Sequence, residues 1–142
     1  MYFFVECIPQ GKERPRFDFR SRRAYTPAKT RAYEDRIARA FRRAAIAEDF
    51  RIIEGPVELT IVACFPVPKS YSQKTRASCL QGNQPPTKRP DADNLEKAVA
   101  DALNGLAYFD DAQIVHSAVT KTYAEVPGLR IWVSPFSPRV AD

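Results

Sequence analysis

Alternating apolar and polar positions predict one long strand in the middle of the chain. Over 57–65, Val57, Leu59 and Ile61 alternate with more polar residues, which is the period of a strand with one buried face. Other apolar segments predict three further strands, over 2–8, 113–123 and 129–134. The sequence Val126-Pro127-Gly128 favours a tight turn, so the last two strands are expected to form a hairpin.

Two other segments carry apolar residues at helical spacing. Thr26 and Pro27 offer a hydroxyl cap followed by a proline at the first helical position, and this helix is expected to run to about Ala47. Its apolar stripe consists of Tyr33, Ile37, Phe41, Ala44 and Ala45. A second helix is predicted over 94–104, with a stop at Asn104-Gly105. Its polar stripe consists of Asn94, Lys97, Asp101 and Asn104.

These elements predict an α+β fold, a two-layer arrangement in which two main helices pack on a mixed sheet. The expected order is strand, helix, strand, helix, strand, strand, within a single domain that spans 1–142. A small hairpin over 16–19 and 24–25 is a weaker expectation. Residues 66–90 contain five prolines and no acidic residue, so they are interpreted as a long basic loop with about one helical turn over 74–80. Residues 136–142 are expected to be a loose tail.

Composition narrows the function classes. The chain has 142 residues, 22 Lys and Arg against 17 Asp and Glu, and a net charge of +5, which makes a polyanionic partner plausible. No apolar run approaches the roughly 20 residues that cross a bilayer, and the N-terminus does not resemble a signal peptide. The cysteines Cys7, Cys64 and Cys79 show no zinc or disulfide pattern. A cytoplasmic protein without a membrane partner is therefore expected.

Paired carboxylates open the second predicted helix. Pro90 favours extended backbone before it, so Asp91 and Asp93 are expected to point the same way. Two carboxylates aimed at one place repel each other unless a cation or a proton lies between them. Lys97 follows Asp93 by one helical turn. Aspartate oxygens suit Mg²⁺, and a nearby lysine could offset charge that develops on a phosphate.

A second acidic pair, Asp110-Asp111, lies just before the strand over 113–123. A chain that returns from the helix stop at Gly105 could bring this pair to the first one. Simpler interpretations stay open from the residues alone. Asp93 and Glu96 have the spacing of a capping box, Asp110 and Asp111 could be turn residues, and Lys97 with Asp101 could be a surface ion pair.

The stretch RPDADNLEKAVADALNGLAYFDDAQIV resembles the signature of the RusA family of Holliday-junction resolvases. That signature reads roughly (K/R)-P-D-x-D-N-L-x-K, then D-x-L, then D-D-x-Q-(I/V). The matching residues are Arg89, Pro90, Asp91, Asp93, Asn94, Leu95, Lys97, Asp101, Leu103, Asp110, Asp111, Gln113 and Ile114. The long loop over 66–90 is similar to that of the phage-associated branch of the family.

The resemblance implies a homodimeric, Mg²⁺-dependent endonuclease, with Mn²⁺ as a substitute. Such an enzyme resolves four-way DNA junctions by paired symmetric nicks, in recombination and repair in a bacterial cytosol. The implied metal-binding and catalytic acids are Asp91, Asp93 and Asp111, and Lys97 is the implied catalytic lysine. Asp110 is a weaker candidate. A role for Asp101 in orienting Lys97 is expected.

Basic residues in the early segment and in the long loop are expected to contact DNA phosphates. They are Arg14, Arg16, Arg20, Arg22, Arg23, Lys69, Lys74, Arg76, Lys88 and Arg89. They could instead only solvate mobile loops. Phe17, Phe19 and Tyr71 could stack on bases or take part in packing, and the one histidine, His116, has no partner motif.

Two alternative functions stay open at the level of the sequence. The first is a non-catalytic module that binds branched DNA, which the intact set of acids disfavours. The second is a nuclease for flaps or other branched DNA, because motif residues do not encode the shape of the substrate.

Overall fold

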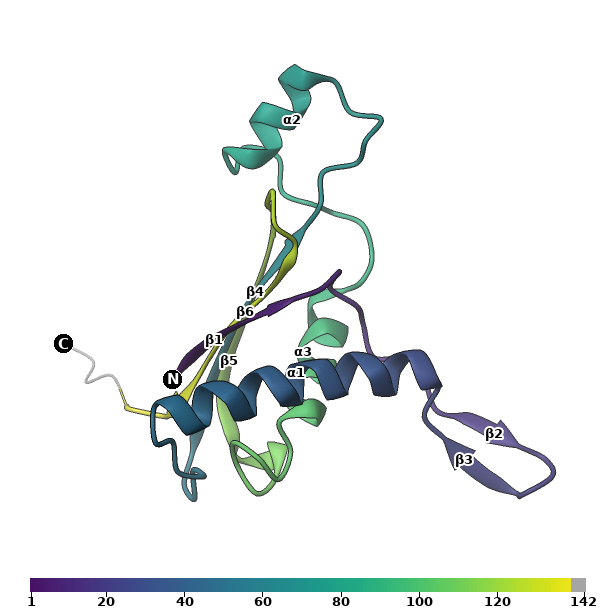
Figure 1. The fold of residues 1–142 in the computed structure, drawn as a ribbon, viewed down its shortest axis with the longest axis vertical. Coiled ribbons are helices and arrows are strands. Elements are labelled where there is room, and N and C mark those ends of the chain that lie inside the picture. Colours follow the sequence, from purple (N-terminus) through teal and green to yellow (C-terminus); the bar gives the residue numbers. More distant parts are fainter. Residues whose placement is uncertain (139–142) are drawn as a thin grey trace.

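The computed structural model describes residues 1–138 and confirms an α+β fold with a mixed sheet (Figure 1). The elements in chain order are β1 (Tyr2–Glu6), β2 (Arg16–Asp18), β3 (Arg23–Tyr25), α1 (Ala28–Ala47), β4 (Val57–Phe65), α2 (Gln73–Leu80), α3 (Ala92–Ala102), the short 3-10 helix η1 (Asp111–Gln113), β5 (Ile114–Tyr123) and β6 (Gly128–Pro135). The two expected main helices are α1 and α3, and α2 is a third helix.

The main sheet has the strand order β1-β6-β4-β5. Strand β4 pairs in parallel with β5 and antiparallel with β6, and β6 pairs antiparallel with β1. The expected hairpin between β5 and β6 is therefore wrong, because β4 lies between these two strands. The turn residues at 126–128 are present, but they carry the chain past the end of β4. A local turn signal does not report which strands become neighbours.

Helices α1 and α3 cover one face of the sheet. Leu59, Ile61 and Ile131 are fully buried in this face, and they form one core with residues of α1 and α3. The opposite face of the sheet carries Tyr2 and Trp132, whose ring centroids are 4.9 Å apart and which are 43% and 40% exposed. Packing against this face therefore fixes how α3 is rotated about its axis, and α3 carries the predicted residues Asp93 and Lys97.

Helix starts differ from the sequence expectations by one or two residues. Helix α1 begins at Ala28 with Pro27 at its cap position and no side-chain cap, so Thr26 is not the cap. Helix α3 begins at Ala92, with Asp91 at the cap position and Asp93 inside the first turn. The capping-box interpretation of Asp93 is therefore wrong.

Two basic segments project from the body (Figure 1). The hairpin arm (residues 16–25) confirms the weakly expected hairpin, since β2 and β3 pair antiparallel. The α2 lobe (residues 66–90) contains a helix of eight residues that Ser72 caps through its hydroxyl, where about one turn was expected. Tail residues 139–142 lie outside the described residues. Within residues 1–138, no helix has the length and apolarity needed to cross a bilayer.

Candidate active site

Helix α3 presents the first predicted acids and the lysine to solvent. Leu95, Ala98 and Val99 are buried in the core, and the opposite side of the helix is therefore exposed. Asp93 and Lys97 are one turn apart on that side and are both exposed. Asp91, at the cap position with φ −69° and ψ 155°, is exposed beside them. The local sequence thus places three of the four predicted catalytic residues on one surface.

The largest cavity at this surface has a volume of about 810 Å³. Helix α3 forms one wall, the segment before the hairpin arm forms another, and Arg89 lies at the rim where the α2 lobe ends. The lining residues are Lys12, Glu13, Arg14, Pro15, Thr26, Arg89, Asp91, Asp93, Asn94, Lys97 and Asp101. Four carboxylates and four basic side chains thus line one cavity. Basic side chains suit a phosphate group, and carboxylates suit a divalent cation bound next to it.

A second cavity, of about 280 Å³, lies on the other side of Asp93 and Lys97. Its lining residues are Asp93, Glu96, Lys97, Ala100, Asp111, Ile114 and Ser117. Asp111 therefore faces α3 across this cavity, although it is far from Asp93 in the sequence. Asp93 and Lys97 form the wall between the two cavities. The structure brings Asp111 to Asp93, while Asp91 lies on the opposite side of that wall.

The carboxylate oxygens of these acids suit a hard divalent cation. The three side chains do not, however, come together as a complete set of metal ligands. Within residues 1–138, no three His, Cys, Asp or Glu side chains lie close enough together to hold a metal ion. Mg²⁺ usually takes one or two carboxylates and keeps several waters. Asp93 and Asp111, which line one cavity, could supply such a pair. Asp91 would be the additional donor from the neighbouring cavity.

The loop that carries Asp111 is held by its neighbours. The Asp110 carboxylate accepts a hydrogen bond from the Ala112 N–H at 3.0 Å, and Gln113 completes a capping box. Gln113 Oε1 accepts from the N–H groups of Phe109 and Asp110 at 2.8 and 3.0 Å. Its Nε2 donates to the carbonyls of Ile53 and Gly55 at 2.8 and 2.9 Å. Asp110 is thus a turn residue with a structural role, as the simpler interpretation expected.

The two neighbouring carboxyls differ in acidity. The hydrogen bond from the Ala112 N–H, followed by the one with Asp111, lowers the pKa of Asp110. The hydrogen bond with Asp110 raises the pKa of Asp111, and partial burial and the charges of Asp110 and Asp101 act in the same direction. Asp111 therefore faces a negative environment, in which a cation would be favourable.

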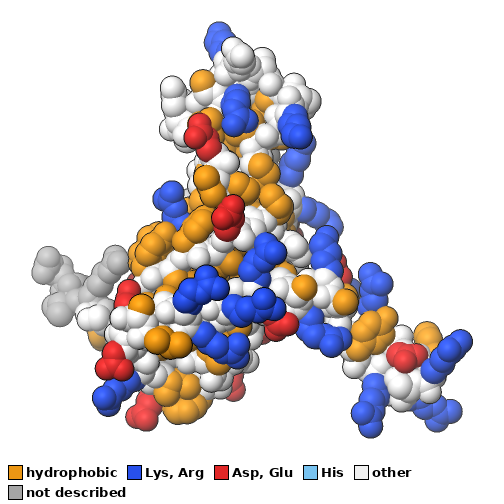
Figure 2. All heavy atoms as spheres, in the orientation of Figure 1, with side chains coloured by type: hydrophobic (Ala, Val, Ile, Leu, Met, Phe, Trp, Pro, Cys, Tyr) orange, Lys and Arg blue, Asp and Glu red, His pale blue; other side chains and the backbone are white. Residues whose placement is uncertain are grey.

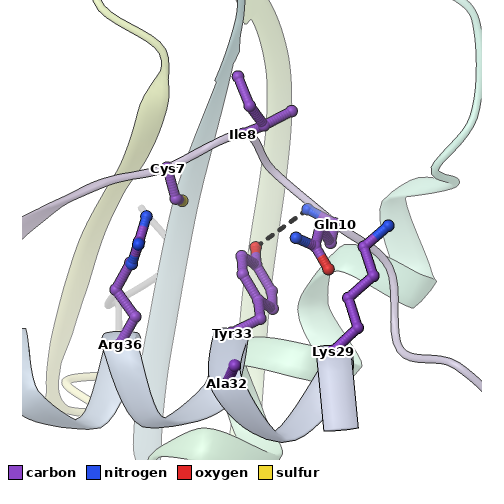
Figure 3. Close-up of a pocket in the computed structure, with 7 residues that line it drawn as sticks. All are labelled: Cys7, Ile8, Gln10, Lys29, Ala32, Tyr33 and Arg36. Carbon is purple, nitrogen blue, oxygen red and sulfur yellow. Dashed lines mark hydrogen bonds between the residues drawn. The ribbon is translucent and has the colours of Figure 1, made fainter. Parts of the chain in front are cut away.

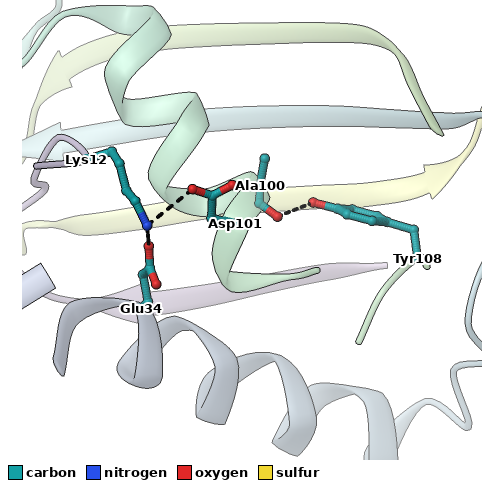
Figure 4. Close-up of polar contacts among 5 residues, drawn as sticks. All are labelled: Lys12, Glu34, Ala100, Asp101 and Tyr108. Carbon is teal, nitrogen blue, oxygen red and sulfur yellow. Dashed lines mark hydrogen bonds and ion pairs between the residues drawn. The ribbon is translucent and has the colours of Figure 1, made fainter. Parts of the chain in front are cut away.

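Asp101 pairs with Lys12 rather than with Lys97 (Figure 4). The distance from Lys12 Nζ to Asp101 Oδ2 is 3.2 Å, and the same ammonium also contacts Glu34 of α1. Among residues 1–138, no hydrogen bond or ion pair joins Asp101 to Lys97. The expected orienting role toward Lys97 and the expected surface pair are therefore not observed. Sequence reasoning did not assign a site role to Lys12, although it lies in the basic segment that was singled out.

All ten basic residues expected to contact DNA are exposed. Four of them lie on the hairpin arm, five lie on the α2 lobe, and Arg14 lies just before the arm. Arg14 and Arg89 line the large cavity. Figure 2 shows blue side chains over both projecting segments. Phe17 and Phe19 are 51% and 86% exposed, which excludes a place in the core of this chain.

A separate cavity of about 280 Å³ lies between the end of β1 and α1 (Figure 3). Cys7, Gln10 and Tyr33 line it, together with Lys29 and Arg36. The Gln10 N–H donates to Tyr33 Oη at 3.2 Å. Burial raises the pKa of the Cys7 thiol to about 11, although Arg36 acts against it, so Cys7 is a poor nucleophile at neutral pH. The buried Cys7 side chain therefore contributes to packing.

Two comparisons with known proteins give a match. Residues 6–134 match the family profile described as Endodeoxyribonuclease RusA. The chain is also 35% identical over 142 residues to the uncharacterized protein YqaN of Bacillus subtilis (strain 168), and the alignment covers 95% of this chain and 96% of the relative.

Proposed function

The chain belongs to the RusA family of endodeoxyribonucleases, and we propose that it resolves Holliday junctions by paired nicks that depend on a divalent metal ion, Mg²⁺ or Mn²⁺. The observation that carries this proposal is the wall formed by Asp93 and Lys97. Asp111 lies in the cavity on one side of it, and Asp91 lies in the cavity on the other side with Arg14 and Arg89. The enzyme would act in DNA recombination and repair.

Asp93 and Asp111 would hold the metal ion, with Asp91 as the additional carboxylate. A bound Mg²⁺ polarises a phosphodiester and lowers the pKa of a coordinated water. Lys97 lies on the same face of α3 as Asp93 and would offset the charge that develops on the phosphate during cleavage. Arg14 and Arg89 line the same cavity and would hold the phosphate backbone next to the acids.

The hairpin arm and the α2 lobe would extend this contact along the DNA. Both are basic, exposed and continuous in sequence with a cation that lines the large cavity. Arg14 lies two residues before the arm, and Arg89 lies near the end of the lobe. A duplex that contacts both projections would therefore pass close to the carboxylates of α3. Phosphate contacts carry no sequence information. Two separated sets of such contacts would instead recognise a branch by its shape.

We test the function with purified protein on a four-way junction, a flap and a linear duplex, each in Mg²⁺, in Mn²⁺ and in EDTA. Metal-dependent symmetric nicking of the junction supports the proposal. Preferential cleavage of the flap would make another branched DNA the substrate. Tight junction binding without nicking in any metal would indicate a non-catalytic module.

Asp93→Asn tests the assignment of the acids. The variant is expected to lose at least about 100-fold in nicking rate, the order expected when a charge-stabilising group is removed, while its Kd for the junction changes little. Lys97→Ala should likewise slow nicking far more than it weakens binding. Asp35→Asn is the matched control, because Asp35 is an exposed acid of α1 outside both cavities. Full nicking by Asp93→Asn would refute its assignment.

A further inference from the structure

Residues 10–12 form hydrogen bonds to both α1 and α3. The Gln10 N–H donates to Tyr33 Oη of α1 at 3.2 Å, and the Lys12 N–H donates to the Asn94 carbonyl of α3 at 3.2 Å. The Lys12 side chain then contacts Glu34 of α1 and Asp101 of α3 (Figure 4). A single residue thus bonds to both helices just before the chain leaves the body.

Gly11 shows how closely this segment approaches the start of α3. A Cβ at position 11 would lie 2.4 Å from Asn94 Nδ2 and 3.1 Å from Pro90 Cβ. Only a residue without a side chain fits there unless its neighbours move. Asn94 and Pro90 flank Asp91 and Asp93 in the sequence, so the segment packs against the part of α3 that carries the acids.

The charge of Lys12 is already engaged within the protein. Its side chain is only 15% exposed, and two carboxylates from different helices contact its ammonium group. Burial works against this charge, but the hydrogen bonds to Glu34 and Asp101 outweigh it and leave the pKa of Lys12 above its ordinary value. Its neighbour Arg14 is exposed and is therefore free to contact a phosphate, whereas Lys12 is not.

The hairpin arm does not pair with the main sheet. Its strands β2 and β3 pair only with each other and form a sheet separate from the main one, and the arm projects beyond the N-terminus of α1 (Figure 1). Two connections join it to the body, at 11–15 and at Thr26-Pro27. The first connection carries the Lys12 bridge.

We infer that Lys12 is a positioning residue that holds the hairpin arm at a fixed orientation to the carboxylates of α3 by bridging Glu34 and Asp101. The inference rests on the proposed nuclease function, in which the arm binds the DNA that the acids cut. It also gives Asp101 a role that its contacts support, as the α3 end of the bridge.

Lys12→Met tests the bridge in the nicking reaction. Single-turnover nicking of the junction should fall between about 10- and 100-fold, since small misplacements of reacting groups cost this much. The slope of log Kd against log salt should stay unchanged. A direct phosphate contact would instead reduce that slope by about one. Lys12→Arg should restore most of the rate, because a guanidinium can pair with both carboxylates. Wild-type nicking by Lys12→Met would overturn the inference, and so would a reduced slope.

Two further variants separate positioning from folding. The triple variant Lys12→Met, Glu34→Gln, Asp101→Asn leaves no unpaired charge, so it should fold with a Tm near that of the wild type and still nick slowly. Arg39→Met is the matched control, since Arg39 is an exposed cation of α1 without an ion pair to a described residue, and it should nick at the wild-type rate. Restored nicking in the triple variant would refute a positioning role.

A distance measurement tests the inference without any nuclease activity. Spin labels on Ser21→Cys at the tip of the arm and Glu48→Cys after α1 replace exposed residues. The distance distribution should be narrow in the otherwise unchanged protein and clearly broader or shifted when Lys12→Met is added. Identical distributions would overturn the bridge as an orienting device. If the wild type does not nick the junction but Lys12→Met still broadens the distance distribution, only the proposed function is refuted.

Discussion

Gln113 uses both atoms of its side-chain amide to connect the loop of Asp111 to the residues before β4. Its oxygen accepts two backbone N–H groups of the loop, and its nitrogen donates to the carbonyls of Ile53 and Gly55. The oxygen and the nitrogen of this amide therefore each make two hydrogen bonds. The motif contains this glutamine, but the sequence does not show its partners, because Ile53 and Gly55 lie far away in the chain.

Gln113→Glu should detach this loop with almost no change in size. A carboxylate oxygen would face two carbonyl oxygens in place of the NH₂ group, so the free energy of unfolding should fall by about 1–3 kcal/mol. Nicking should fall as well, because Asp111 loses its support. Urea unfolding and the nicking assay measure the two effects. Gln73→Glu, at an exposed position at the start of α2, is the control for the urea measurement. Unchanged stability in Gln113→Glu would contradict the importance of these four hydrogen bonds.

The raised pKa of the buried Cys7 thiol predicts that the free energy of unfolding falls at alkaline pH. Its thiol has an ordinary pKa of 9.0 and a folded-state pKa of about 11. Below about pH 9 the thiol is protonated in both states and the shift costs nothing. Between about pH 9 and 11 only the unfolded chain releases the proton, so stability falls by about 2–3 kcal/mol in total. Burial also raises the pKa of Tyr33 and Tyr108, which extends the decline to higher pH.

Urea unfolding from pH 8 to 11 checks this expectation. Cys7→Ala removes the thiol and should show a shallower decline than the wild type over that range. The tyrosine contribution remains in both proteins, so it cancels in the comparison. Parallel curves for the two proteins would show that the thiol ionises equally easily in the folded state.

At the scale of elements, the hairpin arm forms a small basic unit whose turn is fixed from within. The Asp18 carboxylate accepts hydrogen bonds from the Arg20 N–H at 2.9 Å and the Ser21 hydroxyl at 3.1 Å. Phe17 and Phe19 pack edge to face with ring centroids 5.1 Å apart. The arm is therefore ordered by its own contacts while its arginines stay exposed, which the proposed contact with DNA requires.

Replacing two arginines of the arm should weaken binding in a way that depends on salt. Arg20→Gln with Arg23→Gln is expected to reduce the slope of log Kd against log salt by about two, roughly one for each phosphate that is no longer neutralised. Arg42→Gln with Arg43→Gln makes the same charge change at exposed positions of α1 and should leave the slope nearly unchanged. Titrations of the junction between low and moderate salt measure both. Equal losses of affinity in the two double variants would mean that overall charge, rather than the arm, binds the DNA.

The elements differ in how well local sequence specifies them. Strand β4 was predicted with its observed bounds because alternation directly reports which side chains are buried. The start of α3 was placed two residues late, since Asp91 occupies the cap position without making a side-chain cap hydrogen bond. The β5–β6 hairpin was predicted from a turn signal, but β4 offers hydrogen-bonding edges to both strands and takes the place between them.

At the scale of the whole molecule, the acids lie where the two basic projections join the body. This arrangement was only partly accessible from the sequence. The motif gave Asp91, Asp93, Lys97 and Asp111, and the loop after α3 does bring Asp111 to Asp93. The bridge from Lys12 to Glu34 and Asp101 was not accessible, because its three residues come from separate segments and only the packing of α1 on α3 brings them together.

The proposed paired nicks require two sites, so a homodimer with about twice the 16.1 kDa mass of the chain is expected. A two-fold dimer places equivalent sites on opposed strands of a symmetric junction. Light scattering coupled to size exclusion measures the mass. A junction extruded from a supercoiled plasmid tests the pairing, because two cuts in one encounter give linear product, whereas independent cuts first accumulate nicked circles. A monomer that accumulates nicked circles would contradict the expectation.

The strand order has a consequence for synthesis of the protein in the cell. Strand β6 comes after the other three strands of the main sheet in the chain, yet it lies between β1 and β4 and joins them. The core on which α3 rests is therefore incomplete until β6 has been synthesised. A nascent chain that exposes every acid of the motif but not yet β6 would therefore still lack a working active site.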